Sequence, residues 1–309
     1  MIVLAQNVME SVFLGIQFTE NEMVAAVYSN QIFEILEPIQ LPSQFRLFYG
    51  LKPSQANQLA LKQSNYEIQN QELLFEQKSL MEHLVLAVRK LKSMLLEKYP
   101  NAQFNLVIAI PSFYNDFQKS LLLNTFKQLN FTVQLINEPS AMGMFIQNQQ
   151  SPKNFAVVLN SQFETQIGIL KLQNSFLQVQ SVAGEVKNQS SQLQLIKDEF
   201  QQASRKYRDV FMLEGQQLDQ LEYQVKWVEK LAICKGAALQ SSSLQKFAQK
   251  ALQTAETEVS QQIQEKKENI KQTKQTKQTN KKEEIDFDSF DEKFDREFER
   301  QKEGFMQVW

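Results

Sequence analysis

Glycine and cysteine are both rare in this chain. Eight glycines occur in 309 residues, about half or less of the usual fraction of roughly 7%, so few positions allow a loop to bring its backbone close to a phosphate. The single cysteine, Cys234, excludes an internal disulfide and favours a reducing compartment over secretion. The composition therefore argues against a disulfide-stabilised secreted protein.

Long apolar runs and an excess of one charge are absent as well. No stretch of about 18 apolar residues occurs, so we expect no membrane span. The formal net charge of −2 gives no global reason to expect nucleic-acid binding. The N-terminus, MIVLAQNVMESVFLG, lacks a basic signal-peptide start and an Arg-rich transit pattern, which leaves cytoplasm as the expected location. A hydrophobic content of 42% can fill the cores of one large or two medium domains.

The most informative stretch combines two strand-to-helix units. The apolar run from Phe104 to Ile110 stops at Pro111 and precedes apolar residues at helical spacing, which predicts a strand, a turn and a helix. A second run, Phe131 to Ile136, leads into Glu138 and Pro139 at the start of a small-residue helix. The repetition predicts parallel strands with a helical crossover, and ligands in such sheets bind where strands end.

The segment before this stretch begins with a β-rich region. Residues 11–37 divide into three short β-rich pieces, which predict an antiparallel meander. Residues 38–73 are weakly patterned and are expected to be irregular, with one strand near 64–68. Ser79 and Glu82 then form a capping-box signature. It precedes apolar residues on one helical face, namely Leu80, Leu84, Val88, Leu91 and Leu95.

The same order recurs in a compressed form. Residues 154–185 again divide into three β-rich pieces. A helix, two short strands and a final helix are expected after them, in turn over 193–207, 209–213, 223–228 and 229–240. This internal duplication, rather than any single element, decides the fold class as α/β with two related halves.

The C-terminal part differs from the rest. From Lys246 the helical pattern becomes polar, so residues 246–284 are expected to form a polar helical or low-complexity linker. In 285–309, aromatic residues recur at spacings of three and four, on one helical face. A lone helix of this length is marginal in water, so we expect its face to dock on this protein or on another, with equal weight. The expected docking residues are Phe287, Phe290, Phe294, Phe298 and Trp309.

Four fragments, which agree in order and spacing, resemble the nucleotide-binding domain of the heat-shock protein 70 (DnaK) family. They are LVIAIPSFYNDFQKS (106–120), LINEPSAMGM (135–144), the meander from Phe155 to Gly184 that closes with SVAGE, and GAALQ (236–240). The resemblance implies a duplicated actin-like ATPase (ribonuclease H-like) fold with mixed sheets. It implies lobe I over 1–150, a strongly reduced lobe II over 151–245, and a helical C-terminal tail.

The residues that bind phosphate and metal in that family are not retained. Its first phosphate loop, Asp-Leu-Gly-Thr-Thr, is matched by Gln17 to Asn21, where the acid Glu20 would repel phosphate. Its second loop, Asp-Leu-Gly-Gly-Gly-Thr, is matched by Leu159 to Glu164, without a glycine. Gln17 and Leu159 replace the two metal-site aspartates, so Mg²⁺ loses the ligands that phosphoryl transfer requires.

Among the family's working residues only Glu138, the acid next to the nucleotide, is retained. We interpret it as a helix N-terminal residue favoured by the dipole rather than as a general base, because a lone acid without Mg²⁺ ligands does no phosphoryl chemistry. We therefore expect no catalytic residue, no metal site and no cofactor, with ATP or ADP disfavoured. The resemblance implies a vestigial nucleotide cleft that contains Gln17, Thr19, Glu20, Glu138, Leu159, Ser161, Gln162 and Gly215.

Other chemically notable residues are given structural interpretations. His83 lies within the capped helix without a second His or Cys beside it, so a helix-surface or half-buried residue is favoured over a metal ligand. Cys234 is interpreted as a small packed residue. The Lys-Gln-Thr repeat at 271–279 is interpreted as a solubilising spacer rather than as a site for a polyanion.

The resemblance also departs from the family in length. The chain is too short for the family's outer insertions, and no β-rich segment follows residue 245 to form a peptide-binding domain. We therefore expect a catalytically inactive pseudo-ATPase that acts as a structural subunit, contacting other proteins through its C-terminal helix and trimmed lobes, with no nucleic acid and no membrane. The alternative is an ATP- or ADP-binding chaperone or co-chaperone with little or no turnover, and a weaker one is an active ATPase with substituted ligands. A cytoskeletal or ciliary assembly ranks ahead of a mitochondrial one.

Overall fold

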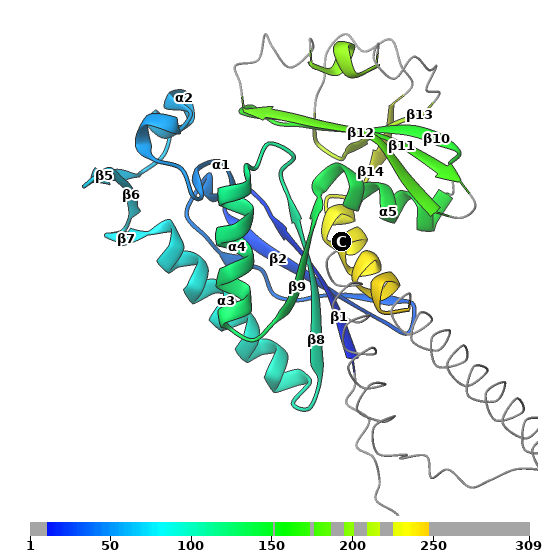
Figure 1. Ribbon diagram of the computed structural model, residues 1–309, viewed down its shortest axis with the longest axis horizontal. Coiled ribbons are helices and arrows are strands. Elements are labelled where there is room, and N and C mark those ends of the chain that lie inside the picture. Colours follow the sequence, from blue (N-terminus) through cyan, green and yellow to red (C-terminus); the bar gives the residue numbers. More distant parts are fainter. Residues whose placement is uncertain are drawn as a thin grey trace, which may run out of the picture. The chain divides into compact units, whose positions relative to one another are not determined.

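The computed structural model describes residues 11–150, 152–173, 176–186, 195–200, 209–216 and 225–246. All of these residues belong to one compact unit of the chain, Met1–Ala248. The described part is a mixed α/β structure with two large mixed sheets and one small antiparallel sheet (Figure 1). The α/β class expected from the sequence is confirmed. The expected linker, 246–284, lies outside the described residues except for its first position, as do Phe287, Phe290, Phe294, Phe298 and Trp309.

The first large sheet combines an antiparallel meander with two parallel strands. In spatial order it contains β3 (Ile32–Ile35), β2 (Glu22–Ser29), β1 (Ser11–Phe18), β8 (Gln103–Ile110) and β9 (Thr132–Asn137), and β4 (Ile39–Gln40) pairs with β2. Strands β1, β8 and β9 are parallel to one another, whereas β1, β2 and β3 alternate in direction. Both the expected meander and the expected parallel pair are confirmed.

The second large sheet repeats this arrangement, except that it has no counterpart of β4 among the described residues. In spatial order it contains β12 (Phe176–Val186), β11 (Glu164–Gln173), β10 (Asn154–Asn160), β13 (Asp209–Leu213) and β14 (Val225–Val228). Strands β10, β13 and β14 are parallel, and β10, β11 and β12 alternate in direction. The two sheets therefore share one order and one set of directions, as the internal repeat of the sequence predicts.

Two helices cover one face of the first sheet. Helix α3 (Leu80–Lys98) begins with a reciprocal capping box, in which the Ser79 side chain accepts from the Glu82 amide and the Glu82 side chain accepts from the Ser79 amide. Helix α4 (Asp116–Gln128) has an equivalent box between Asn115 and Gln118. The five apolar positions predicted on α3 are all buried in a core that also contains the inward residues of β1 and β8.

The segment before α3 is more ordered than the sequence suggests. It contains α1 (Phe45–Phe48), η1 (Pro53–Gln55), α2 (Gln58–Lys62) and a small antiparallel sheet of β5 (Glu67–Gln69), β6 (Glu72–Phe75) and β7 (Lys78–Ser79). The prediction of an irregular segment over 38–73 was thus wrong. Elements of two to five residues are too short to show a hydrophobic period, so the pattern could not reveal them.

Tight hairpins in this part of the chain form without glycine. Asn30 and Gln31, between β2 and β3, both have positive φ, at 50° and 66°. The same holds for Asn70 with Gln71 and for Glu76 with Gln77. Two consecutive residues at positive φ are the signature of the primed turn that suits the twist of a hairpin, where glycine is normally favoured at the second position. Glutamine occupies that position in all three hairpins.

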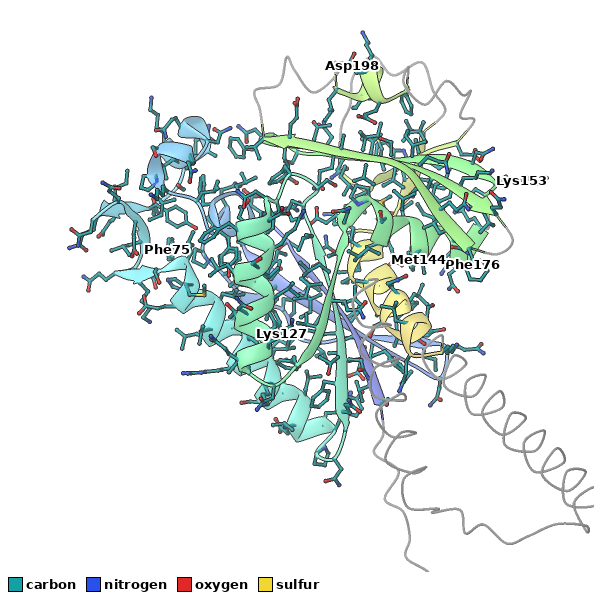
Figure 2. All side chains as sticks on the ribbon, in the orientation of Figure 1. Phe75, Lys127, Met144, Lys153, Phe176 and Asp198 are labelled. Carbon is teal, nitrogen blue, oxygen red and sulfur yellow. The ribbon has the colours of Figure 1, made fainter. Side chains whose placement is uncertain are left out.

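A layer of two helices packs between the two large sheets. These are α5 (Glu138–Gln150) and a helix over residues 232–246, drawn in yellow in Figure 1, and their side chains form a shared core with residues of both sheets (Figure 2). The final helix was expected over 229–240, so its bounds were wrong by several residues at each end. Its extension carries buried Ser241 and Ser242, and the Ser241 hydroxyl donates to the Asn105 carbonyl at 2.9 Å.

The outer face of the second sheet has a smaller core. Ile196, in a helix over residues 195–200, packs there with apolar residues of β10, β11 and β13. The remainder of the helix expected over 193–207 lies outside the described residues, as does the start of the strand expected over 223–228. The first lobe consists of the first sheet with its preceding and covering elements up to residue 137, and the second lobe consists of the second sheet with helix 195–200.

Candidate functional site

The candidate site lies where the two lobes meet, at the turns that the family resemblance assigns to phosphate binding. The first turn, 19–21, connects β1 and β2, and the second, 161–163, connects β10 and β11. In each turn, a backbone amide donates a hydrogen bond to a carbonyl at the other end of the same turn. The Thr19 amide donates to the Glu22 carbonyl at 2.8 Å, and the Ser161 amide donates to the Glu164 carbonyl at 2.9 Å. Neither amide is directed at a ligand.

The first turn is also tied to the segment before α1. The Leu41 amide donates to the Asn21 carbonyl at 2.8 Å, and the Gln44 amide donates to the Glu20 carbonyl at 2.7 Å. The Gln44 side-chain amide donates a further hydrogen bond to the Glu20 carboxylate. Glu20, which was predicted to repel phosphate, thus has a specific partner, and these bonds fix the chain as it enters α1.

Helix α1 places a buried arginine between the lobes. The Arg46 Nη2 atom lies 2.5 Å from Glu138 Oε2, at the start of α5, and 2.6 Å from Glu164 Oε1, at the start of β11. Its Nη1 atom donates to the Phe18 carbonyl, at the end of β1, at 3.3 Å. One guanidinium therefore contacts the end of a first-lobe strand, the helix between the sheets and a second-lobe strand.

A glutamine completes this group. The Gln166 Nε2 atom, from β11, donates to Glu138 Oε2 at 2.6 Å and lies 3.5 Å from Glu164 Oε1. Its Oε1 atom accepts from the Ser112 amide at 2.7 Å, which ties the group to the loop after β8. We call these four residues, Arg46, Glu138, Glu164 and Gln166, the Arg46 cluster. Glu138, the acid that the resemblance places next to the nucleotide, is one of its members.

The electrostatics of the Arg46 cluster follow from burial and charge balance. Burial raises the pKa of Glu138 to about 7, with Glu164 adding to the rise and Arg46 opposing it. Burial also raises the pKa of Glu164, again opposed by Arg46. Burial alone would lower the pKa of Arg46, but the two carboxylates raise it, so the guanidinium stays charged. Two acids beside one base leave the fully ionised cluster with an excess of one negative charge.

The second turn contributes an apolar contact between the lobes. Phe163, 5% exposed, belongs to the core of the first lobe although it follows β10 of the second. A residue at this position in a phosphate-binding loop would have to leave space for an anion. Here the position carries an aromatic ring that packs into the first-lobe core.

The residues of the expected vestigial cleft are only partly brought together. Gln17 is 4% exposed, and its Oε1 atom has no hydrogen-bond partner among the described residues. Leu159 is buried in the core between the sheets, whereas Gln162 is exposed. Gly215 lies in a turn after β13 with φ of +84°. No described contact joins Glu138 to the other seven residues, namely Gln17, Thr19, Glu20, Leu159, Ser161, Gln162 and Gly215.

The residues that do surround Glu138 were missed. Glu138 is not the lone acid that the sequence suggested, because Glu164 shares the same arginine nitrogen. One weak signal pointed to Arg46: it lies between the apolar Phe45 and Leu47, and an arginine that is itself buried in such a segment needs an acidic partner. The structural interpretations of two other residues are confirmed. Half-buried His83 bonds the Phe75 carbonyl through Nε2 at 2.8 Å, and Cys234 is buried.

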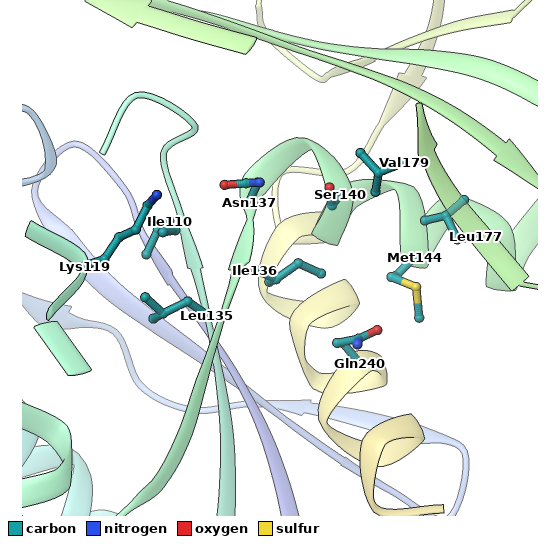
Figure 3. Close-up of a pocket in the computed structure, with 10 residues that line it drawn as sticks. All are labelled: Ile110, Lys119, Leu135, Ile136, Asn137, Ser140, Met144, Leu177, Val179 and Gln240. Carbon is teal, nitrogen blue, oxygen red and sulfur yellow. The ribbon is translucent and has the colours of Figure 1, made fainter. Parts of the chain in front are cut away.

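A groove lies beside the contact between the lobes, between the edge strands of the two large sheets. Strand β9 is an edge of the first sheet and β12 is an edge of the second, and residues of both line a cavity of about 470 Å³ (Figure 3). Its apolar lining residues include Leu135, Ile136, Met144, Leu177 and Val179. Lys119 is the charged residue among the lining side chains, and Asn137, Ser140 and Gln240 supply polar groups.

Within the part of the chain that the structure describes, no group of three or more His, Cys, Asp or Glu residues could hold a metal ion. No helix there is long and apolar enough to cross a membrane. No protein-family model matches the sequence, and no curated protein matches it significantly.

Proposed function

We propose that this chain is a catalytically inactive, heat-shock-70-like pseudo-ATPase that serves as a structural subunit of a larger protein assembly. The observation that carries the proposal is the Arg46 cluster. In phosphoryl-transfer enzymes a metal ion and backbone amides neutralise the phosphates. In this chain, an internal guanidinium lies among the acids at that place, so the positive charge is part of the protein.

The turns support the same function. A nucleotide would need the amides of both turns and the space between them, whereas the Thr19 and Ser161 amides bond within their own turns. Phe163, in the second turn, packs into the first-lobe core. A triphosphate beside the Arg46 cluster would compete with Glu138 and Glu164 for one guanidinium, and the two carboxylates would repel the anion.

The finer fold assignment belongs to this proposal. Two sheets of one topology, with a pair of helices between them, agree with a duplicated actin-like ATPase fold whose second lobe is reduced. Such a body retains the architecture of the fold, whose surfaces are then available to neighbouring subunits.

Nucleotide binding separates this proposal from its alternative, a chaperone that senses ATP or ADP without turnover. We expect 1 mM Mg·ATP or Mg·ADP to leave the thermal unfolding midpoint of the full chain unchanged. A nucleotide present at 100 times its Kd would stabilise the protein by about 2.7 kcal/mol, which is a shift of several degrees. Such a shift, absent with Mg²⁺ alone, would favour the alternative and overturn the loss of binding.

Membership in an assembly is a second, independent test. We expect the protein in native extract to sediment with a large complex at fixed stoichiometry, and a chain that lacks 285–309 to sediment alone. A chain that lacks only the Lys-Gln-Thr repeat, 271–279, is the matched control and should remain in the complex. A wild-type protein that sediments as a free monomer in native extract would contradict the structural role.

The groove between β9 and β12 provides a surface for a neighbouring subunit. Its apolar side chains and its lysine, which also pairs with the exposed Asp116 at 3.4 Å, fit an extended segment with apolar side chains and one carboxylate directed at Lys119. Lys119→Glu should therefore lower the occupancy of the chain in the complex. Lys127→Glu, an exposed change on the same helix, is the control and should have no effect. Equal occupancy of both variants would place the contact elsewhere.

A further inference from the structure

The Arg46 cluster joins the two lobes and the helix layer between them. Arg46 extends from α1 in the first lobe, and Glu164 and Gln166 extend from β11 in the second. Glu138 lies at the start of α5, in the layer between the sheets. The four side chains can meet only when the two lobes are closed on each other, so the cluster reports closure directly.

The closed cluster has an unbalanced charge. Both carboxylates contact the same Nη2 atom of a single arginine, and the side chains of Glu138 and Glu164 are 0% and 7% exposed. A buried excess negative charge is unfavourable, because burial removes the solvation that an ionised carboxylate has in water. Separation of the lobes would return both carboxylates to water, where each can ionise without this cost.

We propose that the Arg46 cluster is a proton-operated latch: the closed arrangement of the lobes takes up one proton on its pair of carboxylates, and loss of that proton releases the lobes. The proposal goes beyond the structural role proposed above and does not depend on it, because it concerns the closure of the chain itself.

Tyr114 and Glu20, two titratable groups near the latch, leave this proton assignment intact. Tyr114, whose hydroxyl donates to the Arg46 carbonyl at 2.9 Å, has its pKa raised by burial and stays neutral. Glu20, on the first turn, bonds to Gln44 rather than to the cluster. Glu185 lies on β12, opposite Thr165 of β11. On α1, α5 and β11 the charged groups that face the latch are its own members.

The direction of the effect follows from the pKa of Glu138. An acid with the ordinary value of 4.5 when the lobes are apart and about 7 when they are closed binds its proton more tightly in the closed form. Protonation of Glu138 therefore makes its full contribution to the stability of the closed form at and below pH 4.5. This contribution is lost progressively as the pH rises to about 7. Within this window a single proton changes the ratio of open to closed forms by up to about tenfold per pH unit.

The latch can be tested by measuring the distance between two spin labels on the full chain with double electron–electron resonance. Spin labels at Asn124→Cys on α4 and Gln178→Cys on β12 report the separation of the lobes, because both positions are exposed. Native Cys234 should remain unlabelled, since burial raises the pKa of its thiol to about 12. We expect the fraction with a long label distance to rise between pH 5 and pH 8. An identical distance distribution across this range would overturn the proposal.

A neutral mimic isolates the responsible group. Glu138→Gln reproduces the protonated acid in shape and charge, so this variant should stay closed at pH 8 and lose most of the pH dependence. Glu97→Gln, on the exposed face of α3, is the control and should behave like the wild type. A Glu138→Gln variant that keeps the full wild-type dependence would contradict the assignment.

A measurement on the unaltered protein covers the case in which the variant fails to fold. The wild-type infrared spectrum should contain the carbonyl band of a buried protonated carboxylic acid at pH 5.5, and this band should disappear with a midpoint near pH 7. Absence of any such band that titrates near neutral pH would show that no proton is held in the cluster.

Discussion

Gly236 lies directly against Ala141, where the helix over 232–246 crosses α5. A Cβ atom added at Gly236 would lie 1.7 Å from the Ala141 carbonyl oxygen and 2.6 Å from its carbonyl carbon. The two helices thus touch backbone to backbone, in the layer that separates the sheets.

Replacement of this glycine should be costly. Gly236→Ala would gain up to about 1 kcal/mol of helix propensity, but the clash with backbone atoms cannot be relieved without moving a helix. We expect a net loss of about 3 kcal/mol in the free energy of unfolding, at the upper end of overpacking effects, measured by guanidinium titration. Ser243→Ala, in the same helix, should change it by less than about 1 kcal/mol. A Gly236→Ala variant as stable as the wild type would show that the helices are farther apart.

Truncation of Phe163 should weaken the contact between the lobes. Phe163→Ala removes a buried ring from the first-lobe core and should lower the free energy of unfolding by about 3 kcal/mol. Hydrogen exchange should also increase at the amides of β10 and β11 next to the turn. Gln162→Ala, its exposed neighbour, should change stability by about 0.5 kcal/mol or less. Equal effects of the two substitutions would place the ring outside the core.

Removal of Arg46 should leave two buried carboxylates without a cation. Arg46→Met should lower the free energy of unfolding at pH 8 by about 3–5 kcal/mol, the usual range for one partner of a buried ion pair. The loss should be smaller at pH 5, because protonated acids no longer require the cation. Arg89→Met, on the exposed side of α3, serves as the control. A loss that grows as the pH falls would have the wrong sign for this explanation.

The hairpin between β2 and β3 can be stabilised by glycine, which is absent from its turn. Gln31 has φ of 66° at the second position of its turn, where a side chain is strained and glycine is not. Gln31→Gly should therefore raise the free energy of unfolding by about 0.5–1 kcal/mol. Gln31→Ala is the matched control and should bring no gain, since alanine keeps the Cβ atom. A gain of equal size from alanine would attribute the effect to loss of the glutamine side chain instead.

Sequence patterns found the elements that are long enough to show a period. Helix α3 begins at the predicted capping box, and strand β13 has the predicted bounds of Asp209–Leu213. The internal repeat is matched by two sheets of one topology. In each case the prediction depends on neighbouring residues, whose spacing is visible in the chain itself.

The candidate site could not be found in this way. Arg46 lies in a helix of four residues that follows Gln44 in a left-handed conformation, and nothing in its local pattern indicates which acids it contacts. Glu138 is 92 positions away along the chain. Charge pairing over such separations depends on how the lobes meet. In a single sequence, the only visible trace of this pairing is an arginine between apolar residues.

The hydrogen bond between the final helix and β1 has a consequence for folding during synthesis. The Gln245 side chain donates to the Ser11 hydroxyl at 2.9 Å, so the last described segment completes the contacts of the first strand. On a ribosome, one face of β1 must wait for nearly 250 residues to be synthesised before its covering helix emerges. At about 5–20 residues per second, that strand is uncovered for more than about ten seconds. That face of β1 therefore stays exposed in nascent chains until the final helix leaves the exit tunnel.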